Sequence, residues 1–156
     1  MARAQESDPV DPYNLQRFVA AQNPVYDQVR RELREGLKRG HWMWFIFPQV
    51  KGLGHSEMAL IFGIASLDEA KAYLSHAILG PRLLECTQLV MRVEERTVQQ
   101  IFGDPDELKF RSCMTLFAHA ATENTIFKSA LRKYCGNEFD QLTVHRLRPG
   151  VESSEI

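Results

Sequence analysis

The sequence is poor in the features that mark several protein classes. It has three cysteines, Cys86, Cys113 and Cys135, at long spacings, where a disulfide framework has an even, regularly spaced set; we therefore expect reduced thiols packed in a core. No stretch approaches the ~18 apolar residues of a membrane span. Residues 1–14 are polar and lack the apolar core of a signal peptide. These absences predict a cytoplasmic protein that does not contact membranes.

Charge and motif patterns exclude further classes. The chain has 19 Lys+Arg against 20 Asp+Glu, a formal net charge of −1, so no overall positive field would attract nucleic acid. The five histidines show no H-x-x-H or H-E-x-x-H spacing, and no C-x-x-C pair occurs. Phosphate-binding loops, nucleophile elbows and dinucleotide fingerprints are also missing. We expect no metal and no cofactor, and the sequence leaves open whether the protein is an enzyme.

An apolar period of helical type is present along nearly the whole chain. Apolar residues recur every four positions from Val25 to Leu37, and we expect Gly40 to end that helix. Further helix starts are expected at Asp11–Pro12, Asn23–Pro24, Ser66 (a capping box with Glu69), Thr97 and Asp104–Pro105. The sequence predicts an all-α fold, a compact single-domain helical bundle of about seven to eight short helices over residues 11–148. The polar ends, 1–10 and 149–156, are predicted to be disordered tails.

Residues 41–49, HWMWFIFPQ, are apolar all round and carry the densest aromatic content. Their residue types favour a strand, but one strand without a partner leaves its backbone groups unpaired, so we predict a buried helical turn. The rings of Trp42, Trp44 and Phe47, with His41 and Gln49 beside them, can hold a planar ligand ring. The same residues can equally form the densest part of an ordinary core.

The loop that follows, residues 49–56, has two glycines, a lysine and a histidine before a helix start at Ser56. Backbone N–H groups at such a start can bind an anion. A glycine turn with a serine cap explains the loop equally well.

Four polar residues align on the helix predicted for residues 105–121. Lys109, Ser112, Thr115 and His119 are spaced by three, three and four, which places them on one face. We call them the polar stripe. The stripe is either the solvent edge of the helix, with hydroxyls bonded to the preceding turn, or the wall of a polar pocket. In a pocket, Lys109 would pair with an anion, Ser112 and Thr115 would orient the ligand, and His119 or His41 would be the acid–base group of an enzyme.

Several strings resemble a known family. They are HWMWFIFPQVKGLGHS at 41–56, ASLDEAKAYL at 65–74, LGPRL at 79–83 and KFRSCMTLF at 109–117. Together they are similar to a bacterial family of unknown function whose members are sometimes labelled calpastatin. The resemblance implies a compact all-α fold and brings no established activity, substrate or catalytic residue. The calpastatin label itself has no basis here, because calpastatin inhibitory segments are disordered and this sequence predicts a packed domain.

The leading hypothesis is a pocket between the aromatic run 41–49 and the helix 105–121 that binds a small anionic, nucleotide-like ligand. One alternative is a protein–protein interaction module in which the aromatic run is exposed; no protein partner can be named from the sequence. A second alternative is a purely structural small domain, in which packing accounts for every pattern.

Overall fold

The computed structural model describes residues 10–123 and 125–147. In these ranges the chain forms ten α-helices, so the all-α prediction is confirmed, while the expected number of seven to eight is too low. The difference arises because two elements expected only as short helical turns, α3 and α7, count as separate helices. The helices are α1 (Gln16–Gln22), α2 (Tyr26–Glu35), α3 (Met43–Ile46), α4 (Glu57–Phe62), α5 (Leu67–Ser75), α6 (Leu79–Met91), α7 (Val98–Phe102), α8 (Asp106–Ala120), α9 (Ile126–Tyr134) and α10 (Gln141–Leu147). The predicted tails, apart from Val10, and residue 148 lie outside the described residues.

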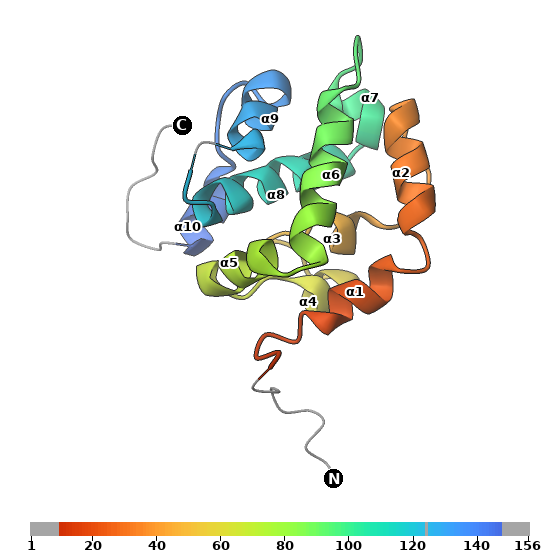
Figure 1. Cartoon of the computed structure of the whole chain (residues 1–156). Helices are drawn as coiled ribbons and strands as arrows, with labels where there is room; N and C mark the ends of the chain where they lie inside the picture. The colour runs from red at the N-terminus through yellow and green to blue at the C-terminus, as the bar shows by residue number, and fades with distance from the viewer. Residues whose placement is uncertain (1–9, 124, 148–156) are drawn as a thin grey trace.

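Helix α8 lies in the middle of the fold, with α9 and α10 on one side and α1 and α2 on the other (Figure 1). It packs against α5, α7, α9 and α10, while α6 packs against α2, α5 and α9. The α8 side chains predicted to face the core, including Phe110, Cys113 and Phe117, are fully buried. Among the residues that the structure describes, no helix is long and apolar enough to cross a membrane.

Helix α2 ends earlier than expected, at Glu35 rather than at Gly40. Gly36 takes the left-handed conformation, with φ of 75°, and its N–H caps carbonyls of the last turn. The next residues turn away because the backbone N–H of Lys38 donates to the carbonyl of Ile101 in α7, at 2.8 Å. Leu37 therefore leaves the apolar stripe and is partly exposed.

The first two helices begin later than the proline signals indicate. The carboxylate of Asp11 accepts hydrogen bonds from the backbone N–H groups of Leu15 and Gln16, and α1 starts at Gln16. The segment that contains Pro12 is a turn that precedes the helix. Similarly, α2 starts at Tyr26, after a turn that contains Pro24. Both predicted helices exist, but Pro12 and Pro24 lie in the turns that precede them and not in their first turns.

A buried carboxylate fixes the aromatic run, whose helical turn is confirmed as α3. One oxygen of Glu32 accepts from the N–H groups of Arg39, Gly40 and the Trp42 indole, and the other accepts from the Gln28 amide. Burial raises the pKa of Glu32, but these donors outweigh that effect and lower it to about 2. Trp42 is only 1% exposed, so this bond also satisfies an indole N–H that water does not reach.

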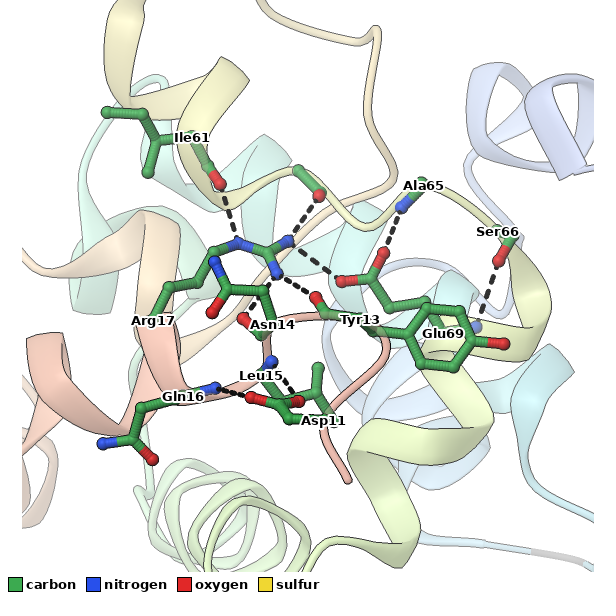
Figure 2. Close-up of polar contacts among 11 residues, drawn as sticks. Asp11, Tyr13, Asn14, Leu15, Gln16, Arg17, Ile61, Ala65, Ser66 and Glu69 are labelled. Atoms are coloured by element: carbon green, nitrogen blue, oxygen red, sulfur yellow. Dashed lines mark hydrogen bonds and ion pairs between the residues drawn. The ribbon is translucent and has the colours of Figure 1, made fainter. Parts of the chain in front are cut away.

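A second polar network, the Arg17 clamp, fixes the chain at residues 61–63, after the loop that follows the run. The guanidinium of Arg17 donates to the carbonyls of Ile61 and Gly63, at 2.8 and 3.0 Å, and to those of Tyr13 and Asn14 (Figure 2). It also pairs with Glu69 at 2.9 Å. We define the clamp as Arg17, Glu69 and the carbonyls that Arg17 binds.

The clamp reaches the loop 49–56 through backbone pairing. The second oxygen of Glu69 accepts from Ala65 N–H (Figure 2). Ile64, between the clamped residues, forms an isolated parallel bridge with Val50. Its N–H donates to the Gln49 carbonyl at 2.9 Å, and its carbonyl accepts from Lys51 N–H at 2.8 Å. The position of the loop therefore depends on side chains in α1 and α5.

Candidate functional site

A pocket of about 510 Å³ lies where α8 faces the loop 49–56 and the start of α10. It is lined by Trp44, Gln49, Leu53, Gly54, His55, Ser56, Ala59, Pro105, Leu108, Lys109, Ser112, Asp140 and Leu142. We call it the Trp44 pocket. Its volume falls within the ~300–1,000 Å³ typical of small-molecule sites. Four of the predicted ligand-binding residues, Trp44, Gln49, Lys109 and Ser112, therefore meet at one place.

The charge of the pocket comes from a lysine–aspartate–lysine arrangement. Asp106 lies between Lys38, at 2.7 Å, and Lys109, at 3.0 Å. Burial raises the pKa of Asp106, but the two ammonium groups outweigh it and hold that pKa below its usual value. Two cations thus share one carboxylate, which leaves one net positive charge.

Lys109 is the member of this group that can reach a ligand. The Lys38 ammonium also donates to the Gly40 carbonyl at 2.6 Å and lies 5.2 Å from the Trp42 ring centroid. Only 8% of the Lys38 side chain is exposed, against 22% for Lys109. The Lys109 ammonium lies 5.8 Å from the Trp44 ring centroid, close enough for a cation–π contact. Charge and ring face therefore occur side by side in the pocket.

The middle of the polar stripe joins α8 to the start of α10. Thr115 is fully buried; its hydroxyl donates to the Arg111 carbonyl and accepts from Asp140 N–H at 2.8 Å. The Ser112 hydroxyl lies 3.1 Å from the Leu108 carbonyl and 3.2 Å from the Asp140 carboxylate. The same carboxylate caps α10 by accepting from Thr143 N–H. Both residues are buried, so they do not form a solvent edge. Ser112 lines the pocket, whereas Thr115 lies behind it and supports its wall.

The remaining predicted residues lie away from the pocket. The small helix α3 turns Trp44 outward, whereas Trp42 and Phe47 point into the core, where Phe47 packs against Phe102 and Phe110. His41 is exposed and His119 packs on Phe139, with ring centroids 4.6 Å apart and its Nδ1 2.8 Å from the Thr115 carbonyl. None of these four lines the pocket.

Several lining residues were not among the predicted ligand-binding set. His55 and Ser56 belong to the loop that the sequence singled out only as a backbone anion site, and in the structure the Ser56 hydroxyl caps α4. Asp140 was missed altogether. Its D-x-x-T spacing to Thr143 is a helix-start signal, but its approach to Ser112 depends on tertiary packing.

The three cysteines have no disulfide partner and do not belong to the pocket. Burial raises the pKa of Cys86 to about 12, that of Cys135 to about 11, and that of Cys113 well above its usual value. Thiols with such high pKa values carry almost no thiolate at neutral pH. The expectation that they are packing residues agrees with this placement.

A comparison with family models then places the chain. The model described as "Protein of unknown function (DUF1810)" matches residues 12–147. The chain belongs to the DUF1810 family. The crystal structure of the conserved hypothetical protein Rv1873 from Mycobacterium tuberculosis is similar, with 57% sequence identity, a TM-score of 0.87, and coverage of 88% of this chain and 98% of that one. No curated protein matches the chain.

The DUF1810 match covers every residue that lines the Trp44 pocket. It confirms the predicted membership of a family of unknown function. The DUF1810 description names no activity, and neither does the description of the similar structure. A function for this DUF1810 domain has to be argued from the pocket itself.

Proposed function

We propose that the Trp44 pocket binds a small anionic ligand that contains a planar ring, of the nucleotide type. The observation that carries this proposal is the pairing of an incompletely neutralised ammonium group, on Lys109, with the face of the Trp44 ring in one pocket of about 510 Å³.

The ring specificity follows from the apolar part of the lining. Trp44 is partly buried, and Leu53, Leu108 and Leu142 lie around the same space. An aromatic ligand ring can stack on the indole and bury its other face against leucine. Leu108 and Leu142 are 55% and 67% exposed, so a ligand here would also cover apolar surface that now faces water.

The anion specificity follows from the polar part. Lys109 supplies the net charge of the Lys38–Asp106–Lys109 arrangement, and His55 lies in the same lining. The side chains of Gln49 and His55 make no hydrogen bond to any described residue, and both are free to bind a ligand. Asp140, the one carboxylate in the lining, is engaged by Thr143 and Ser112. These hydrogen bonds occupy the Asp140 carboxylate without cancelling its charge, so the preference for an anion rests on Lys109 and on the unengaged donors of Gln49 and His55.

The test is a thermal-shift and tryptophan-fluorescence titration with adenosine, AMP and ADP. We expect AMP or ADP to raise the melting temperature, adenosine to do so less, and Trp44→Phe to remove the fluorescence change. Lys71→Ala is the matched control, because Lys71 is an exposed lysine that lines a different pocket of about 540 Å³. No shift at millimolar nucleotide, or equal binding by Lys109→Ala and Lys71→Ala, would contradict the proposal.

A second candidate function is protein recognition, and the exposure of Leu108 and Leu142 favours it. The partner would insert an apolar side chain beside Trp44, the one Trp or Phe side chain of the run that is not fully buried. The two candidates separate on a Leu142→Ser variant. Loss of a protein partner with no nucleotide binding by the unaltered chain would support recognition over ligand binding.

A further inference from the structure

A third pocket, of about 480 Å³, has a strongly basic lining. It is lined by Val50, Lys51, Ala65, His145 and Arg146. Three of these five side chains are basic, and they come from two distant parts of the sequence, the loop 49–56 and helix α10. We call it the basic pocket.

The basic residues of this pocket are not neutralised by the described part of the chain. Neither Lys51, His145 nor Arg146 forms an ion pair or a side-chain hydrogen bond with any residue in 10–123 or 125–147. Like charges that share one pocket repel one another, and a bound anion relieves that repulsion.

Gly52 leaves room for the Arg146 guanidinium. Gly52 has φ of +101°, in the region that favours glycine, and a Cβ at this position would overlap the Arg146 guanidinium. The absence of a side chain lets the guanidinium lie directly against the loop that carries Lys51. The Arg146 guanidinium thus lies against the residue that follows Lys51, and neither cation has an acidic partner among the described residues.

We propose that the basic pocket is an oxyanion site for a phosphate group, free or as a phosphate monoester. The planar guanidinium of Arg146 presents two parallel N–H donors to two phosphate oxygens, Lys51 adds a compact charge, and His145 adds a ring N–H. The site is separate from the one proposed above, although the loop 49–56 and α10 contribute to both: Gln49 and Leu142 line the Trp44 pocket, and Lys51 and Arg146 line this one.

The experiment is a titration of the full chain with inorganic phosphate and, separately, with glycerol phosphate as a simple monoester, at low ionic strength and followed by ¹H–¹⁵N NMR and calorimetry; the tighter binder of the two identifies the source. We expect shifts centred on residues 50–52 and 145–146. Arg146→Ala should weaken binding roughly tenfold or more, the value of a charged hydrogen bond, and Lys51→Ala should weaken it less. Arg146→Lys, which keeps the charge but not the fork, should recover part of the loss.

Arg31→Ala is the matched control, because Arg31 is an exposed arginine on α2 without an ion pair among the described residues. Equal weakening by Arg31→Ala would show a diffuse charge effect and overturn the proposal. Binding that Lys109→Ala abolishes and Arg146→Ala leaves intact would overturn it too, because the phosphate would then lie in the Trp44 pocket.

Discussion

Arg17 and Arg146 show two opposite uses of the same side chain. Arg17 donates to four carbonyls and one carboxylate, and its side chain is 18% exposed. Arg146 is exposed and has no such partner among the described residues. This difference separates two kinds of polar residue. A residue that stabilises the fold has every side-chain donor satisfied inside the chain, whereas a residue available to a ligand does not.

The largest expected loss of stability is at Arg17, whose donors are all satisfied inside the chain. Arg17→Ala removes the ion-pair partner of Glu69, whose side chain is 4% exposed, and takes the Arg17 donors away from one oxygen of that carboxylate and from four carbonyls. Loss of one member of a buried pair costs about 3–5 kcal/mol of unfolding free energy. Urea unfolding would measure it, with Arg31→Ala as the control, expected within about 0.5 kcal/mol of the parent. A loss as small as that of the control would mean that the clamp is not structural.

The two tryptophans allow a second form of the comparison at one short helix, since Trp42 precedes α3 and Trp44 lies in it. Trp42→Ala should cost about 3–5 kcal/mol, because it empties a fully buried site. Trp44→Ala, at a half-buried position that lines the pocket, should cost only about 1–2 kcal/mol. Urea midpoints of both variants would test this order. Equal costs would place the Trp44 ring in the core and remove the stacking face from the proposed ligand site.

The Glu32 carboxylate predicts a pH dependence. Its pKa is about 2 in the folded chain against 4.5 ordinarily. Because the folded pKa is the lower one, the carboxylate stabilises the fold fully above about pH 4.5 and loses this effect as the pH falls toward 2, by about 3 kcal/mol. Unfolding of the parent and of Glu32→Gln should therefore differ at pH 7 and converge below pH 4.5. A difference that does not change with pH would mean that the charge of Glu32 contributes nothing.

The smallest effect on stability is expected at Lys109, the lysine of the proposed ligand site. Lys109→Ala should leave the urea midpoint nearly unchanged, because its ion pair with Asp106 is partly exposed and Asp106 keeps Lys38. Nucleotide binding should weaken by about 1.5–3 kcal/mol, the value of a hydrogen bond to a charged group. Calorimetric titration measures the second quantity. If Lys109→Ala lowered the urea midpoint strongly and still bound nucleotide as the parent does, Lys109 would stabilise the fold and not contact the ligand.

The sequence predicted the helices well because each apolar face repeats at helical spacing, but it could not predict where α2 ends. Gly36 and Gly40 are both suitable end residues, and the choice depends on the Lys38–Ile101 backbone bond, which joins distant segments. The Ser66–Glu69 pattern shows the same limit. Ser66 caps α5 as expected, but the Glu69 carboxylate binds Arg17 and Ala65 N–H, which no local pattern reveals.

Within the candidate site, the residues on regular helical spacing were predicted best. Helical spacing alone places Lys109 and Ser112 on one face of α8, independently of the segments that pack against it, and both line the pocket. The aromatic run has no apolar period, so its sequence could not show that Trp44 faces outward while Trp42 and Phe47 face inward. Asp140 was beyond sequence reasoning because its contact with Ser112 requires the packing of α10 on α8.

The Arg17 clamp has a consequence for the order in which the chain acquires its pocket. The lining comes from three distant segments, 44–59, 105–112 and 140–142, and the first is held through Ile64 by residues 17 and 69. A chain emerging from the ribosome has the clamp long before it has Asp140 and Leu142. The last wall of the pocket is added only when residue 142 can pack, so a growing chain that already has the complete clamp still lacks part of the lining proposed to hold a ligand.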